Sequence, residues 1–243
     1  MSEAQLNPMH HLEIHKYFEV KLFGLDISFT NSSLMMIGVS LFLCLFFWIS
    51  LRKTSINPSK IQYIAELLYS FGDKISTASI GENSEKFSPF IVSLLCYIGL
   101  LNFLGIFLFS PASHISITIP MGMITCFTCV IISIKMHKFN FFSIFIPPGV
   151  PLLIKPLMFF IEFCSYISRP FSLGLRLAAN IIAGHVLLAV IGSFVIGMKF
   201  FGFIPLIVVV TMAMFECLVG LLQAYIFSSL SAAYIGEAKN QNH

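Results

Sequence analysis

Apolar residues along this chain gather into five long runs that are separated by short polar stretches. The runs cover residues 34–51, 90–109, 115–134, 157–198 and 203–235. A helix needs about 20 predominantly apolar residues to cross the hydrocarbon core of a bilayer, and each run approaches or exceeds that length. The pattern therefore predicts five membrane helices joined by short connections.

Two further segments are partly apolar but do not fit a span. Asn57 and Pro58 form a favourable helix start, and apolar residues then recur at helical spacing as far as Ile75, interleaved with charged ones. This pattern predicts an amphipathic helix on the membrane surface. The segment 139–150 is apolar but is interrupted by Pro147 and Pro148, so we expect it to be interfacial or re-entrant.

The last two apolar runs are too long for an upright span. The run 157–198 contains Pro170, where we expect a kink. The run 203–235 would extend about 50 Å as a helix, whereas the hydrocarbon core is about 30 Å thick. The sequence thus predicts a hairpin of two long, steeply inclined helices, a shape that suits a protein partner curved in the same plane.

Composition agrees with an all-α integral membrane protein. Of the 243 residues, 57% are hydrophobic and 10% are charged, whereas a soluble domain has about 25% charged residues. A net charge of +3 leaves no basic face for nucleic acid, and no GxxxxGK[ST] phosphate loop is present, so we expect no nucleotide on this chain. The six cysteines lie in apolar stretches without zinc-site spacing, so we expect neither a metal nor a cofactor.

We expect a single membrane domain over residues 1–243. It comprises an outer N-terminal segment (1–33), three spans with the surface helix (34–138), and the long hairpin with a short C-terminal tail (139–243). Lysine and arginine concentrate in the segments that follow the first, third and fifth spans. The positive-inside rule therefore places the N-terminus outside and the C-terminus in the cytoplasm or matrix.

Arg176 is the most unusual residue of the hairpin. Apart from Lys199 in the turn, no formal charge follows it until Glu216. A charge deep in a span costs several kcal/mol, from about 2.5 to above 10, and a guanidinium cannot escape that cost by losing its proton. Arg176 is therefore either paired structurally, with Glu216 or Glu162, or a fixed cation on an ion path.

Helical geometry places the other polar residues of the hairpin. The residues within about 60° of Arg176 are small or polar and allow another helix to approach closely, namely Ser172, Ala179, Asn180 and Ala183. On the last run, Glu216 shares a face with Gly220 and Gln223. A contact between His185 and Glu216 across the hairpin would satisfy both groups and could pass protons; a purely structural contact is the alternative.

Two sequence motifs resemble subunit a of the rotary F-type ATP synthase. Residues 169–185, RPFSLGLRLAANIIAGH, resemble the signature of that family's penultimate helix. QAYIF at 223–227, preceded by Glu216, resembles the signature of its last helix. The likeness covers essentially the whole chain. It implies a proton-translocating membrane subunit of the ATP synthase that is not an enzyme by itself.

The resemblance also implies roles for particular residues. Arg176 is the essential arginine that faces the proton-carrying carboxylate of the c-ring, with Asn180 and Gln223 as polar neighbours. His185 and Glu216 belong to the aqueous half-channel on the outer side.

Three more residues belong to the expected proton path. Asn102, within LNFLG, resembles the polar position of the second span that lines the uptake route. Glu162 resembles an acidic position found in mitochondrial and related bacterial forms, and Ser172 lies on the face of Arg176. Many bacterial members carry the acid and the histidine of positions 185 and 216 the other way round.

The expected partners are the c-subunit ring, b-type peripheral stalk subunits and membrane lipid, without nucleic acid. We expect the bacterial plasma (inner) membrane, with the mitochondrial inner membrane as the alternative. Two other classes of function remain open from the residues alone. A stand-alone channel or secondary transporter would need inverted repeats or a substrate pocket. A structural anchor would need Arg176 and Glu216 to pair only with each other.

Overall fold

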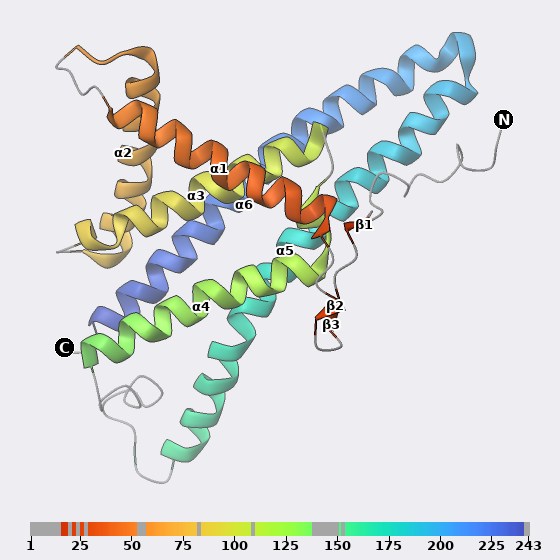
Figure 1. Cartoon of the computed structure of the whole chain (residues 1–243). Helices are drawn as coiled ribbons and strands as arrows, with labels where there is room; N and C mark the ends of the chain where they lie inside the picture. The colour runs from red at the N-terminus through yellow and green to blue at the C-terminus, as the bar shows by residue number, and fades with distance from the viewer. Residues whose placement is uncertain are drawn as a thin grey trace. The chain divides into compact units, whose positions relative to one another are not determined.

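The computed structural model describes residues 16–18, 21–22, 25–26, 29–52, 57–81, 84–107, 110–137, 151 and 154–240. Six α-helices account for most of them (Figure 1). In chain order they are α1 (Asn31–Leu51), α2 (Lys60–Ile80), α3 (Ser88–Phe107), α4 (Ile115–His137), α5 (Lys155–Gly197) and α6 (Phe203–Asn240).

Five of these helices are long and apolar enough to cross a membrane, and α2 is not among them. The predicted all-α membrane fold is thereby confirmed, and each predicted span lies on a helix whose ends differ from the prediction by a few residues. The segment 139–150, predicted to be interfacial or re-entrant, lies outside the described residues.

Short strands precede the first helix, which the hydrophobic pattern did not predict. β1 (Lys16–Phe18) pairs antiparallel with β4 (Phe29–Thr30), and β2 (Lys21–Leu22) pairs antiparallel with β3 (Leu25–Asp26). Thr30 ends β4 and also caps α1, because its hydroxyl oxygen accepts a hydrogen bond from the backbone N–H of Ser33 at 3.4 Å.

The two C-terminal helices have the length that the sequence predicted. α5 contains 43 residues and continues through Pro170, and α6 contains 38. At about 1.5 Å per residue they extend about 65 Å and 57 Å. Because the hydrocarbon core is about 30 Å thick, helices of this length must incline strongly to stay within the membrane.

Contacts divide the chain into two compact units, and both α5 and α6 contribute to each. The first unit comprises Met1–Ala65, Cys96–His114 and Leu177–Tyr225, and the second comprises Glu66–Leu95, Ile115–Arg176 and Ile226–His243.

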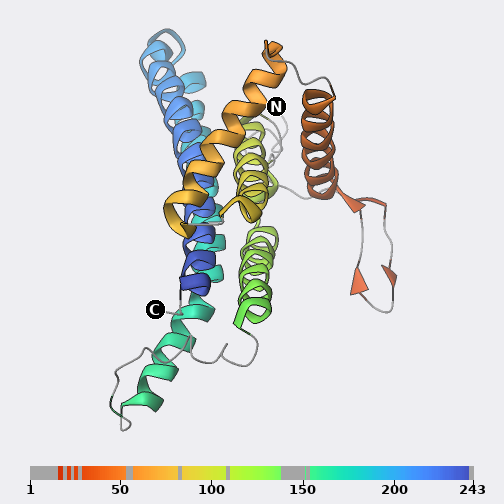
Figure 2. The same cartoon turned by 90° about the vertical axis from the view of Figure 1, so that its left-hand side faces the viewer.

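In the first unit, the second part of α5 and the first part of α6 form the end of the hairpin. The 3-10 turn η6 (Lys199–Gly202) joins them (Figure 2). A Cβ at Gly202 would lie 2.4 Å from the carbonyl oxygen of Val195, so only glycine fits this turn. α3 packs on α6 in the same unit, where Gly99 faces Ala224.

In the second unit, glycines bring helix backbones together. A Cβ at Gly174 of α5 would lie 2.8 Å from the carbonyl oxygen of Thr118 of α4. A Cβ at Gly236 of α6 would lie 2.3 Å from the carbonyl oxygen of Ser79 of α2. Small residues at such crossings let membrane helices gain packing contacts without a hydrophobic driving force.

Candidate functional site

His185 of α5 and Glu216 of α6 meet across the hairpin within the first unit. Nε2 of His185 lies 4.0 Å from Oε1 of Glu216, and the two side chains are 19% and 10% exposed. The structure thus brings together the two groups that the sequence proposed as a pair. Gly184, which the sequence analysis did not select, makes room for them, because a Cβ there would lie 2.5 Å from Cδ and from Oε1 of Glu216.

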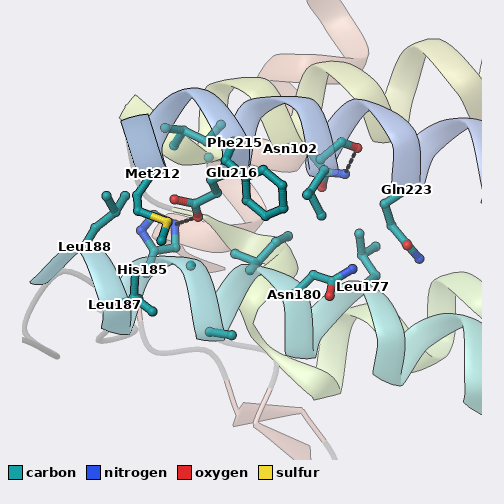
Figure 3. A pocket seen from close by; sticks show the side chains of 17 residues that line it. Asn102, Leu177, Asn180, His185, Leu187, Leu188, Met212, Phe215, Glu216 and Gln223 are labelled. Atoms are coloured by element: carbon teal, nitrogen blue, oxygen red, sulfur yellow. Dashed lines mark hydrogen bonds and ion pairs between the residues drawn. The ribbon is translucent and has the colours of Figure 1, made fainter. Parts of the chain in front are cut away.

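A cavity of about 280 Å³ surrounds this pair. Its walls are mainly apolar side chains of α5 and α6, including Leu177, Leu188, Met212 and Phe215 (Figure 3). Its polar groups are the five that the sequence analysis placed on the outer path or beside the arginine: Asn102, Asn180, His185, Glu216 and Gln223. The predicted common face of Glu216, Gly220 and Gln223 therefore lines this cavity.

Several polar atoms at the cavity are buried without a hydrogen-bond partner among the described residues. They are both carboxylate oxygens of Glu216, Oδ1 of Asn102 and Nε2 of Gln223. Leaving such atoms unpaired in a protein interior costs free energy. A cavity of this size has room for several water molecules, and these polar atoms offer them hydrogen-bond partners. The arrangement is suited to a chain of water that links these side chains.

Asn102 reaches the cavity from α3. Its Nδ2 donates a hydrogen bond of 2.9 Å to the backbone carbonyl of Gly220, and the residue is buried. Gly220 favours this close approach, since a Cβ there would lie 3.3 Å from Cβ of Asn102, which is a tight contact. α3 and α6 are thereby tied together beside Glu216.

Arg176 lies on an exposed face of α5. Ser172, Ala179, Asn180 and Ala183, the small and polar residues predicted to share its face, are exposed as well. Among the described residues Arg176 forms no ion pair. Of the two acids that the sequence left open as its partner, Glu162 lies 3.5 Å from Arg169 and Glu216 lies 4.0 Å from His185.

Glu162 does not line the cavity and belongs to a different cluster in the second unit. Its partner Arg169 also contacts Glu237. Sequence reasoning assigned no role to Arg169 or Glu237. The signal available for Arg169 was its seven-residue spacing from both Glu162 and Arg176, whereas no local signal links Arg169 to Glu237, which is 68 residues away.

Two comparisons relate this chain to known proteins. Residues 33–236 match the family described as ATP synthase A chain. The chain is 33% identical over 257 residues to ATP synthase subunit a of Maricaulis maris (strain MCS10), in an alignment that covers 99% of this chain and 100% of that protein.

Proposed function

This chain belongs to the ATP synthase subunit a family, and on that premise we propose that it provides two aqueous half-channels and an essential arginine facing a c-ring carboxylate. It is a multi-pass membrane protein that acts in proton transport within the ATP synthase complex and is not catalytic alone.

The cavity around His185 and Glu216 is the proton uptake route in this proposal. Protons enter from the outer side and pass along water, the imidazole of His185 and the carboxylate of Glu216. Asn102 holds α3 against α6 in the wall of the cavity through its hydrogen bond to Gly220. His185 suits this task because an imidazole gains and loses a proton near neutral pH. The route delivers the proton to a carboxylate on a neighbouring c subunit. The carboxylate becomes a neutral carboxylic acid, and rotation of the ring then carries it into contact with lipid.

Arg176 is the fixed cation at which a c subunit gives up its proton. The observation that supports this role most strongly is its exposure on a face of small and polar residues, without an acidic partner in the described part of the chain. A bare guanidinium in lipid is costly, so a partner carboxylate must compensate it. The small residues around it let a helix of the c-ring approach closely.

The charge of Arg176 also gives the transfer its direction. An adjacent cation favours the ionised form of a carboxylate, so the c subunit releases its proton into the second half-channel on the cytoplasmic side. The same charge repels protons that would pass directly between the half-channels. Each proton crossing 100 mV makes about 2.3 kcal/mol available, which drives rotation of the ring.

The c-ring, b-type peripheral stalk subunits and membrane lipid are the partners in this proposal. The exposed face of Arg176 supports the assignment of the c-ring. The bacterial source of the relative supports placing the chain in a bacterial plasma (inner) membrane, multi-pass, with the mitochondrial inner membrane as the alternative.

Replacing the cation tests this function. Arg176→Ala is expected to abolish coupled ATP synthesis in membrane vesicles while the complex still assembles. The matched control is Leu175→Ala, which changes an exposed apolar neighbour on the same helix and is expected to retain synthesis. ATP synthesis by Arg176→Ala at the rate of the unmodified complex would refute the fixed-cation role.

A further inference from the structure

Two glycines bring α4 and α5 together, one from each helix. A Cβ at Gly122 of α4 would lie 2.5 Å from the carbonyl oxygen of Pro170 of α5. A Cβ at Gly174 of α5 would lie 2.8 Å from the carbonyl oxygen of Thr118 of α4. Each helix therefore presents a glycine to the backbone of the other, and neither position accepts a side chain unless backbone atoms move.

The two contacts fix how far α4 and α5 are displaced along each other. On each helix the two contact residues are four positions apart, which is about one turn and about 6 Å of rise. Sliding one helix by a turn would bring Thr118 or Cys126 to the place of Gly122, and Pro170 to the place of Gly174. Because these residues carry side chains, the observed offset is favoured over its neighbours.

The interface between the two contacts is closely packed. Leu173, which lies between Pro170 and Gly174 on α5, is 3% exposed. Together with Gly122 and Thr125 it lines a void of only about 10 Å³, which is at the lower limit for a single water molecule. A methyl group added at either glycine therefore has no empty space to fill and must push the two helices apart.

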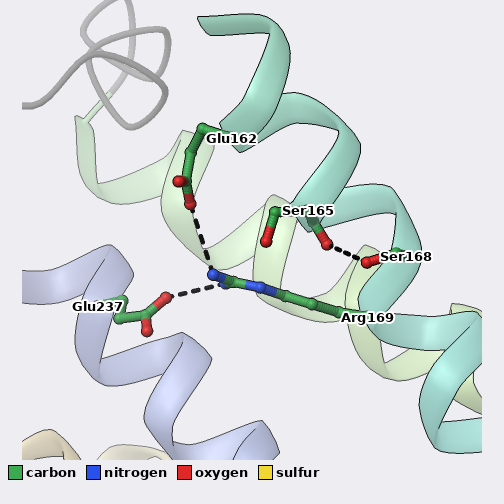
Figure 4. A network of polar contacts seen from close by, with 5 residues as sticks. All are labelled: Glu162, Ser165, Ser168, Arg169 and Glu237. Atoms are coloured by element: carbon green, nitrogen blue, oxygen red, sulfur yellow. Dashed lines mark hydrogen bonds and ion pairs between the residues drawn. The ribbon is translucent and has the colours of Figure 1, made fainter. Parts of the chain in front are cut away.

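The same stretch of α5 is also tied to α6, by an ion pair. Nη1 of Arg169 donates a hydrogen bond of 2.9 Å to Oε2 of Glu237 in α6, and its Nη2 donates one of 3.5 Å to Oε1 of Glu162 in α5 (Figure 4). Just before Arg176, α5 is thus held by backbone contacts with α4 and by a side-chain contact with α6. Movement of this stretch would disturb both neighbouring helices.

Arg176 projects from the side of α5 that is opposite to these glycine contacts. Gly174 comes two residues before it, which is about 3 Å along the helix axis and about 200° around it. Arg176 is exposed, whereas Gly174 is buried. α4 therefore supports α5 from behind at the level of the arginine, and a displacement of α5 at Gly174 carries Arg176 with it.

We propose that Gly122 and Gly174 are positioning residues for Arg176, which set the depth and direction at which the cation meets the c-ring carboxylate. This rests on the proposed function of the chain. Both glycines and Arg176 belong to the second unit. A methyl group at either glycine would displace α5 by roughly 1 Å, and a misplacement of that size can slow a catalysed step about a hundredfold.

The test replaces each glycine by alanine, in the variants Gly122→Ala and Gly174→Ala. The measurement is the rate of ATP-driven proton pumping by the complete complex in inverted membrane vesicles, divided by the number of assembled complexes. Both variants are expected to pump at least about tenfold more slowly than the unmodified complex. Gly192→Ala is the matched control and is expected to pump normally, because a Cβ at that position of α5 meets nothing within 4 Å.

A merely structural role of the glycines would lower the number of assembled complexes but not the rate of each one. Leu173→Ala represents that case, because it removes packing from the same interface without adding bulk. It is expected to lower the midpoint of thermal denaturation and to keep the pumping rate per complex. A normal rate per complex in either glycine variant, or an equal loss in Leu173→Ala, would overturn the proposal.

A distance measurement decides the question if the glycine variants do not assemble. Spin labels are attached through Ile124→Cys on α4 and Ile167→Cys on α5, both exposed positions, in a complex whose native cysteines are replaced by serine. One distance is expected, the same at rest and during ATP hydrolysis. A second population displaced by about one helical turn, 5.4 Å, would overturn the fixed offset.

Arg176→Ala, measured in parallel, separates this proposal from the proposed function. If Arg176→Ala keeps coupled ATP synthesis, the proposed function itself fails. If it is inactive while Gly122→Ala and Gly174→Ala pump normally, only the positioning role of the two glycines fails.

Discussion

Gly184 of α5 lies directly against the carboxylate of Glu216 of α6, so closely that a Cβ at position 184 would come within 2.5 Å of Cδ and Oε1. The missing side chain therefore creates the space in which Glu216 meets His185 at 4.0 Å. Gly184, His185 and Glu216 all belong to the lining of the cavity.

Gly184→Ala is expected to displace the carboxylate of Glu216 and slow proton pumping roughly tenfold, because transfer between positioned groups is sensitive to shifts of about 1 Å. The measurement is ATP-driven acidification of membrane vesicles. Gly192→Ala is the control, since a Cβ at that position of α5 meets nothing within 4 Å. Equal pumping by the two variants would show that the space at Gly184 is dispensable.

Exchanging the acid and the imidazole tests whether His185 and Glu216 act as a pair. His185→Glu alone places two acids together and Glu216→His alone places two imidazoles together, so each single variant is expected to pump poorly. The double variant restores one acid and one imidazole across the same contact and is expected to recover at least about half of the unmodified rate, as coupled neighbours do. A double variant as slow as the slower single one would argue against a functional pair.

Asn102→Ala is expected to destabilise the complex by about 1 kcal/mol, because the variant loses the hydrogen bond from Nδ2 to the carbonyl of Gly220. The check is the midpoint of thermal denaturation of the purified complex. Ser93→Ala serves as the control on the same helix, since Ser93 is exposed and its hydroxyl donates only to Phe90 within α3. A midpoint unchanged by Asn102→Ala, or lowered equally by both substitutions, would contradict the tie between α3 and α6.

Gly236→Ala is expected to cost about 1–3 kcal/mol of stability by overpacking. The new methyl group would meet the carbonyl oxygen of Ser79, 2.3 Å from the ideal Cβ position, and push α6 away from α2. Gly197→Ala has open space at its Cβ and is expected to leave the thermal midpoint nearly unchanged. If the thermal midpoints of both variants equal that of the unmodified complex, α2 and α6 do not pack at Gly236 as described.

The membrane class, the five apolar helices, the amphipathic character of α2 and the faces of the hairpin could all be predicted from the amino-acid sequence. These are local properties, because the length of an apolar run sets whether a helix can cross the bilayer and helical periodicity sets which side chains share a face. The same reasoning identified Arg176 as a costly cation and proposed the contact between His185 and Glu216.

The partner that each charged group takes could not be predicted from the sequence and follows from the fold. The sequence left Arg176 either paired with Glu162 or Glu216 or unpaired, and the fold assigns Glu162 to Arg169 and Glu216 to His185. It also joins Arg169 to Glu237 across 68 residues and Asn102 to Gly220 across 118. Periodicity shows the face on which a residue lies, but it does not show how far one long helix is displaced along another. That displacement is a tertiary property, and in this fold Gly184 lies against Glu216 and Gly220 against Asn102.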